Sequence, residues 1–216
     1  TMVTLSTLVT LWGMRLTFNF ARKGGYSSTE DYRWSIIKKK LNNSFLWQLF
    51  HFFFICGCQV GLFVLFTYPV YCVSRLKGPT PNIPFFAGFC GAIGMLVIET
   101  TADQQQWNFQ NAKHKDPKSS PDAQRGFLTH GLFAYSRHPN YFGEIGFWWC
   151  IWTTSMALIG NVAKSGIIGP LSLTALFCGS TIFTESISSS KYPQYKKYQH
   201  AVSPIIPFFH RELKFD

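Results

Sequence analysis

Residues 45–73 read FLWQLFHFFFICGCQVGLFVLFTYPVYCV, a run of large apolar side chains without a charged residue. A helix of a soluble protein places polar residues on its solvent face at every third or fourth position, and residues 45–66 have no such face. A membrane-spanning helix needs about 20 apolar residues to cross about 30 Å of hydrocarbon. The stretch therefore predicts a transmembrane helix. Its extra length predicts a tilt or a kink, for which Pro69 is the expected position.

Four other apolar stretches have comparable lengths, namely residues 1–20, 84–103, 141–160 and 166–186. The chain has 216 residues, of which 47% are hydrophobic and 14% charged. An average soluble domain has about 25% charged residues. Disorder is excluded, because it requires low hydrophobicity and high charge. We expect an all-α, multi-pass transmembrane helical bundle of about five spans, with residues 1–216 forming a single membrane-embedded domain.

The basic residues agree with this arrangement. If all five stretches cross the membrane, the connections 21–44, 109–140 and 187–216 share one side and hold six, five and five Lys or Arg residues. The connections on the other side hold three. Basic connections face the cytoplasm, or the matrix in a mitochondrial inner membrane. The formal net charge of +10 thus has a membrane explanation. Because no nucleic-acid-binding motif occurs, we expect membrane lipids and no nucleic acid as partners.

Ionisable side chains within the apolar stretches are candidates for function, because each is costly in lipid. They are Arg15, Glu99, Asp103, Glu144 and Glu185. Glu99 and Asp103 are four residues apart and share one helix face. Glu144 follows Asn140 by the same spacing. Polar stripes on two helices predict a water-lined or ligand-lined cavity between them. The alternative is that the carboxylates pair with Arg15 or cap helix ends.

Residues 131–144, GLFAYSRHPNYFGE, indicate an anion site. Pro139 is expected to begin a helix, because proline suits the first helical position. The free N–H groups and the partial positive charge of that helix start, next to Arg137 and His138, suit a phosphate. Asn140 and Glu144 can bond a ribose or an amide. The alternative is an Arg and a His at the membrane interface ahead of a helix.

A second basic segment, residues 191–198, reads KYPQYKKY and interleaves lysines with tyrosines. Nucleotide bases stack on aromatic rings, and phosphates pair with lysine. The alternative is an interfacial aromatic belt with lysines that reach for the headgroups. The predicted topology places this segment, Arg137 and residues 30–33 on the same side of the membrane.

Several of these motifs resemble those of the steroid 5-alpha-reductase family. The stretch SRHPNYFGE at 136–144 looks like its C-terminal motif. The segments LWGMRL at 11–16 and EDYRW at 30–34 are similar to a less characterised branch of the family. Further matches to this branch are Glu99, Asp103, Gln105, Tyr195, Tyr198, Ile206 and Pro207. The sterol C14-reductases belong to the same family, and isoprenylcysteine carboxyl methyltransferases resemble it more distantly.

The resemblance implies an NADPH-dependent membrane oxidoreductase that reduces a carbon–carbon double bond in a steroid, a sterol or another enone lipid. It implies cofactor-binding roles for Arg33, Arg137, His138, Asn140, Tyr141, Glu144, Tyr195 and Tyr198. Hydride attack on an enone requires a proton donor near the developing oxyanion, and a carboxylic acid that burial keeps neutral can serve. Glu99 and Asp103 are the catalytic candidates. The family's reductases have further N-terminal helices, so this sequence is expected to lack some of them.

Two other functions stay open. One is a non-catalytic, reductase-like subunit that acts as a scaffold with other membrane-protein subunits, for example in the mitochondrial inner membrane. The run Ser188–Ser190, where steroid reductases carry basic and histidine residues, favours it. The other is a membrane methyltransferase that uses S-adenosylmethionine.

The resemblance favours the endoplasmic reticulum membrane as the location. No metal site is expected, since no two histidines are spaced i, i+4 and the six cysteines resemble small buried hydrophobes.

Overall fold

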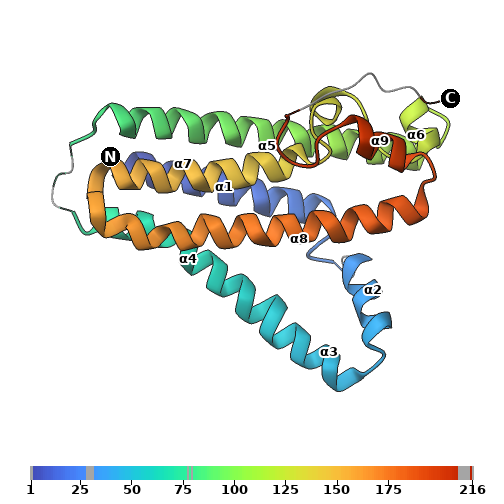
Figure 1. Cartoon of the computed structure of the whole chain (residues 1–216), viewed down its shortest axis with the longest axis horizontal. Coiled ribbons are helices and arrows are strands. Elements are labelled where there is room, and N and C mark those ends of the chain that lie inside the picture. Colours follow the sequence, from blue (N-terminus) through green and yellow to red (C-terminus); the bar gives the residue numbers. More distant parts are fainter. Residues whose placement is uncertain (1, 28–31, 77, 79, 209–214, 216) are drawn as a thin grey trace. The chain divides into compact units, whose positions relative to one another are not determined.

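The computed structural model describes residues 2–27, 32–76, 78, 80–208 and 215. In these residues the chain is helical and forms no β-strand (Figure 1). The helices, in chain order, are α1 (Met2–Arg22), α2 (Tyr32–Leu41), α3 (Ser44–Phe50), η1 (His51–Cys58), α4 (Gln59–Ser74), α5 (Ile83–Lys115), α6 (Pro121–Arg125), η2 (Gly131–Ala134), α7 (Pro139–Ile159), η3 (Gly160–Ile167), α8 (Ile168–Lys191) and α9 (Tyr195–Ala201). Of these, η1 is a π-helix, and η2 and η3 are 3-10 helices.

Three helical segments have the length and apolar composition of a membrane span: Ser44–Ser74, Ile83–Lys115 and Ser165–Lys191. They coincide with three of the five expected stretches, and the all-α fold with membrane-spanning helices is confirmed. The other two stretches form α1 and α7. Each has 21 residues, and a helix of that length extends roughly 32 Å at about 1.5 Å per residue.

The apolar surface of the first span faces outward. Phe52 and Phe53 are each 66% exposed, and large exposed apolar patches mark surfaces that meet a membrane or a partner. The span departs from α-helical geometry at η1, ahead of the position at which we expected a kink. Pro69 lies inside α4, and its ring faces Gly166. A Cβ added to Gly166 would lie 2.7 Å from the Pro69 Cγ.

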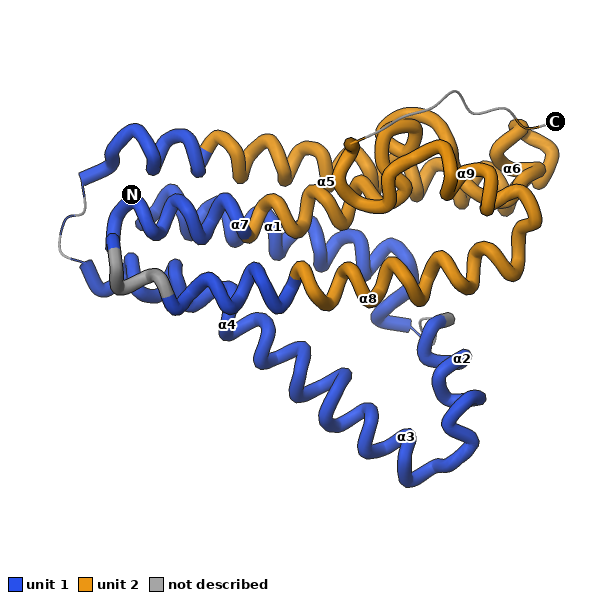
Figure 2. Tube along the Cα trace, in the orientation of Figure 1, with its two compact units in different colours: residues 1–89, 149–173 blue, residues 90–148, 174–216 orange. Residues whose placement is uncertain are grey.

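The chain divides into two compact units, which Figure 2 shows in different colours. The first comprises residues 1–89 and 149–173. Its core joins α1 to α4, with Trp12 edge-on to Phe63 and Phe66 at centroid distances of 6.2 and 6.0 Å. The start of α8 packs closely on α4, because a Cβ at Gly169 would lie 2.6 Å from the backbone of Phe66.

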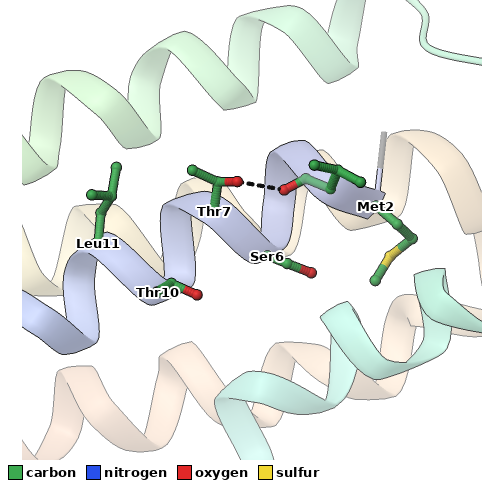
Figure 3. Close-up of a pocket in the computed structure, with 6 residues that line it drawn as sticks. Met2, Ser6, Thr7, Thr10 and Leu11 are labelled. Atoms are coloured by element: carbon green, nitrogen blue, oxygen red, sulfur yellow. Dashed lines mark hydrogen bonds between the residues drawn. The ribbon is translucent and has the colours of Figure 1, made fainter.

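A shallow, open pocket of about 420 Å³ lies along α1 in this first unit (Figure 3). Its lining residues are Met2, Val3, Ser6, Thr7, Thr10 and Leu11. All six come from one helix and none is ionisable. The Thr7 hydroxyl donates to the Val3 carbonyl at 2.8 Å within the same helix. The lining therefore offers three hydroxyl groups but no side chain that could act as a general acid or base.

The second unit comprises residues 90–148 and 174–216 and contains most of the candidate site residues. Its helices α5 and α7 cross at very short range. A Cβ added to Gly143 would lie 2.7 Å from the Glu99 Cβ and 2.9 Å from the Glu99 backbone nitrogen. One turn further along α7, Gly146 faces Met95 in the same way. Two apolar clusters complete the core, one around Phe109, Leu128 and Phe133 and one around Phe127, Tyr195 and Tyr198.

Candidate functional site

The site begins with the extended segment that precedes α7. Arg137 N–H donates to the Ser203 carbonyl at 2.9 Å, and His138 N–H donates to the Pro204 carbonyl at 3.0 Å. Ser136 and Ser203 form a parallel bridge. Pro139 then starts α7, as the sequence predicts. These bonds attach the C-terminal segment to the start of α7.

The Arg137 side chain is buried and fully engaged. Its Nε and Nη2 atoms donate to the two carboxylate oxygens of Glu185 at 2.7 and 2.9 Å. Its Nη1 atom donates to the Gln199 carbonyl at 2.8 Å and to the Val202 carbonyl. Both side chains of the ion pair are about nine-tenths buried, with 8% and 9% of their surface exposed. The Arg137 charge is therefore neutralised within the protein, by a bidentate pair of the strongest kind.

Glu185 contacts two further side chains of the site. His138 Nε2 lies 3.1 Å from Glu185 Oε1, and Gln199 Nε2 donates to Glu185 Oε2 at 2.8 Å. The His138 ring stacks on Tyr141 at 4.9 Å and 14°. A single carboxylate on α8 thus fixes side chains from the segment before α7 and from α9. We name these residues, Arg137, His138, Glu185 and Gln199, the arginine clamp.

The half-buried side chains at the start of α7 are His138, Asn140 and Tyr141. The Tyr141 ring lies 4.5 Å from Phe177 on α8. Because α7 begins at Pro139, the backbone N–H groups of Asn140 and Tyr141 fall in its first turn, where no intrahelical acceptor exists. Such groups, with the helix dipole, favour a bound anion.

Tyr195 and Tyr198 lie in a closed aromatic core. Their exposed fractions are 5% and 2%, and both rings contact Phe127, at 5.1 and 5.5 Å. The Tyr198 hydroxyl donates to the Phe133 carbonyl at 2.5 Å. Burial raises the pKa of Tyr198 above its ordinary value. Tyr198 stacks on Phe127 and Tyr195 meets it edge-on, so the two rings join α9 to the loop before α7.

The predicted catalytic carboxylates lie on α5. Glu99 is 2% exposed and lies at the close crossing with Gly143, and Asp103 is half-buried one turn later. Glu144, on α7, is buried and accepts a hydrogen bond from Trp148 Nε1 at 3.1 Å. The structure places Glu99 against α7, in the same unit as the arginine clamp.

Arg33 belongs to the first unit, on α2, where its guanidinium carbon lies 5.7 Å from the Trp34 ring centroid. Glu30 and Asp31, which carry part of the resemblance, lie outside the described residues. In the part of the chain that the structure describes, no group of three His, Cys, Asp or Glu side chains is arranged to hold a metal ion.

Sequence reasoning missed a second polar cluster, around the buried Asp122. Its carboxylate accepts from Thr129 N–H at 2.8 Å and from the Thr129 hydroxyl at 2.6 Å. It also pairs with Arg125 and lies 2.7 Å from His130 Nδ1. Burial by itself raises the pKa of Asp122, but these hydrogen bonds outweigh it and hold the pKa below its ordinary value. The available signal was Asp122, the one acid in residues 120–131, next to Pro121 at the start of the short helix α6.

Two glutamines also contribute, and the sequence assigned neither of them a role. Gln105, on α5, accepts from the backbone N–H of Leu132 at 3.0 Å and lies against Gly131, whose φ is 65°. It thereby holds the turn η2 just ahead of the clamp. Gln199 is part of the clamp itself. Amide side chains are common in loops, and their distant partners depend on the fold.

Comparison with known proteins gives a family assignment. The chain is 35% identical over 221 aligned residues to "Uncharacterized protein C594.04c" of Schizosaccharomyces pombe. The alignment covers 93% of this chain and 61% of that protein, so the chain spans about three fifths of the length of the curated relative it matches. No solved structure matches. Residues 1–202 match the family described as "Protein of unknown function (DUF1295)". The protein is thus a member of the DUF1295 family.

Proposed function

We propose that this protein catalyses the NADPH-dependent reduction of a carbon–carbon double bond in a steroid, sterol or other enone lipid within the membrane. One observation carries the proposal. The segment before α7 and the C-terminal segment, the two parts that the steroid 5-alpha-reductase resemblance assigns to the cofactor, are bonded to each other through Arg137, Ser203 and Val202. Segments separated by more than 60 residues therefore meet at one place.

The residues at the start of α7 fit the polar part of a dinucleotide. The first-turn N–H groups suit a phosphate. The half-buried His138 and Asn140 supply polar side chains beside it. Arg137 is bound to Glu185, and its role in the proposal is to hold His138 and the C-terminal segment in place. Tyr195 and Tyr198, on α9, attach the C-terminal segment to Phe127 through their ring contacts.

When bound, NADPH supplies a hydride to the double bond. This chain must then hold the substrate carbonyl, deliver a proton and exclude water. Glu99 and Asp103 are the proposed proton donors, because they are carboxyl groups on one face of α5. The close crossing of α5 and α7 at Gly143 leaves no room for water beside the Glu99 backbone.

The test is NADPH binding by the purified chain, measured by calorimetry. We expect micromolar affinity, and a loss of tenfold or more in Asn140→Ala, which corresponds to about 1.4 kcal/mol. Asn111→Ala is the matched control, since Asn111 is half-buried on α5 and remote in sequence from the motif. Binding of S-adenosylmethionine in place of NADPH would favour the methyltransferase. Binding of neither would refute both enzymatic functions.

A second function is favoured by the state of Arg137. Its guanidinium makes four hydrogen bonds to Glu185, Gln199 and Val202, so its charge is already compensated. A clamp of this kind also suits a non-catalytic scaffold subunit of a larger membrane complex. Affinity purification from native membranes separates the two proposals. A scaffold is expected to copurify with other subunits in fixed ratio and to bind no NADPH.

We place the protein in the endoplasmic reticulum membrane, with its basic connections in the cytoplasm, and the mitochondrial inner membrane is the alternative. The proposal rests on the excess of Lys and Arg in the connections 21–44, 109–140 and 187–216. Protease protection of tags placed in these connections, on isolated organelles, tests the orientation and the compartment together.

A further inference from the structure

We propose that the hairpin of α2 and α3, residues 32–50, is a docking surface for the headgroups of anionic phospholipids. This inference is independent of the proposed reaction. In Figure 1, α2 turns back beside α3 at the start of the first span. The hairpin lies within the first unit.

The position of the hairpin follows from the span that it precedes. Ser44–Ser74 has 31 residues, and a helix of that length extends roughly 46 Å at about 1.5 Å per residue. A bilayer measures about 40–45 Å with its headgroup regions included. A span of this length reaches from one headgroup region to the other, so we expect the beginning of α3 at headgroup depth. Only Asn42 and Asn43 separate α2 from α3, so the last turn of α2 lies at the same depth.

The turn fixes how α2 meets α3. Asn42 adopts a left-handed conformation with φ of 43°, which asparagine tolerates better than most residues. Asn43 caps α3, because its side-chain oxygen accepts from the N–H groups of Phe45 and Leu46 at 2.9 and 3.1 Å. The turn thus has a defined geometry and directs α2 back along α3.

Aromatic rings join the two helices. Trp34 on α2 lies edge-on to Phe50 at 6.1 Å, and Phe50 stacks with Trp47 at 5.8 Å. Lys38 Nζ lies 5.7 Å from the Trp47 ring centroid. Tryptophan is enriched at membrane–water interfaces, where its ring faces the apolar region and its N–H faces the headgroups. Both tryptophans agree with the depth derived from the helix length.

The charge of the hairpin matches an anionic surface. Residues 32–50 contain Arg33, Lys38, Lys39 and Lys40 and no Asp or Glu. The three lysines occupy the last turn of α2 and are exposed. Clusters of four or more basic residues next to a membrane span attract anionic lipids, with about 1 kcal/mol for each residue near the surface. The long aliphatic stems of lysine also suit this depth.

The test uses the full chain in nanodiscs of neutral phosphatidylcholine with a titrated fraction of phosphatidylglycerol. Bound lipid is counted by native mass spectrometry. We expect the preference for phosphatidylglycerol to fall tenfold or more in the triple variant Lys38→Gln, Lys39→Gln, Lys40→Gln. We also expect the wild-type preference to weaken at high salt, because exposed charges are screened.

The matched control is the triple variant Lys115→Gln, Lys118→Gln, Lys196→Gln, which removes three exposed lysines from the other two basic connections. It is expected to keep the wild-type preference. An equal loss in both triple variants, or no loss in the variant of Lys38, Lys39 and Lys40, overturns the proposal.

Inorganic phosphate is the second probe. If it displaces the lipid at equal headgroup concentration, the surface recognises free phosphate and the assignment to a bilayer is wrong.

Folding of the hairpin variant is controlled by replacement of the same three lysines with arginine. This variant keeps the charge, and it must retain the lipid preference. If the arginine variant loses the preference while its thermal unfolding in neutral lipid is unchanged, charge is not the determinant and the proposal is refuted.

Discussion

Arg137 and Glu185 are 48 residues apart and form a buried, bidentate ion pair, with distances of 2.7 and 2.9 Å. The pair connects the start of α7 to the end of α8. Because Glu185 also contacts His138 and Gln199, it holds together all the members of the clamp. The same contact is central to both proposed functions, since it either positions a cofactor site or stabilises a scaffold.

Removal of the Glu185 charge is expected to be costly. In Glu185→Gln the Arg137 guanidinium stays buried without a counterion, and breaking such a pair costs about 3–5 kcal/mol. The free energy of unfolding in detergent micelles measures the loss. Asp116→Asn removes an exposed carboxylate and is expected to change stability by about 0.5 kcal/mol or less. Equal effects in the two variants would show that Glu185 and Arg137 are not coupled.

The Tyr198 hydroxyl is expected to contribute one buried hydrogen bond. Tyr198→Phe keeps the ring against Phe127 and removes the bond to the Phe133 carbonyl. The carbonyl is then left without this donor, at a cost of about 1–3 kcal/mol. The loss of stability is measured by thermal unfolding. Tyr26→Phe is the control, because Tyr26 is 73% exposed. An unchanged midpoint for Tyr198→Phe would contradict the bond.

Gly143 is expected to be intolerant of even one added carbon. In Gly143→Ala the new Cβ meets the Glu99 backbone nitrogen at 2.9 Å, so α5 and α7 must separate. Overpacking of this kind costs about 1–3 kcal/mol. Gly94→Ala, on α5, is the control, since nothing lies within 4 Å of a Cβ there. The control is expected to be neutral or stabilising, because alanine favours a helix by about 1 kcal/mol over glycine.

Asp122 is expected to stabilise the protein in a pH-dependent way. Its pKa is lowered in the folded state from the ordinary value of 3.8. The folded protein therefore binds the proton less readily than the unfolded chain. The stabilisation is fully present above the unfolded pKa and is lost as the pH falls through the lowered folded pKa.

Carboxyl carbon chemical shifts in labelled protein measure the Asp122 midpoint directly. A midpoint at or above 3.8 would contradict the hydrogen-bond arrangement with Thr129 and Arg125. Thr129→Val is expected to raise the midpoint, because it removes the hydroxyl donor at 2.6 Å and keeps the backbone donor.

The sequence predicts the helices well and the long-range contacts poorly. Long apolar runs can only be buried in lipid or in a core, so their helices follow from composition. Pro139 begins α7 as predicted, because a local backbone rule decides the position. The pairing of Glu185 depended on where α8 ends relative to α7. A sequence shows only that such a carboxylate needs a partner, and Arg137 is one of several basic residues available.

Tyr195 and Tyr198 illustrate a second limit. Their spacing of three places both on one face of α9, and sequence alone does not decide whether that face meets a ligand or the protein. Phe127 fills the space opposite them. Its contact with residues about 70 positions later depends on the return of the C-terminal segment to Ser136. That return is a single backbone pairing, and no hydrophobic pattern in the sequence marks it.

The bond from Arg137 to the Val202 carbonyl also sets an order of events during biosynthesis. The two residues are 65 positions apart, and a ribosome that adds about 5–20 residues per second needs roughly 3–13 seconds between them. Helices α7 and α8 are thus made before the last partner of the arginine exists. Glu185, the counterion of Arg137, is made only 48 residues after the arginine, so until then the charged side chain must be solvated by water or lipid headgroups, and the clamp is complete only when the C-terminal segment has been made.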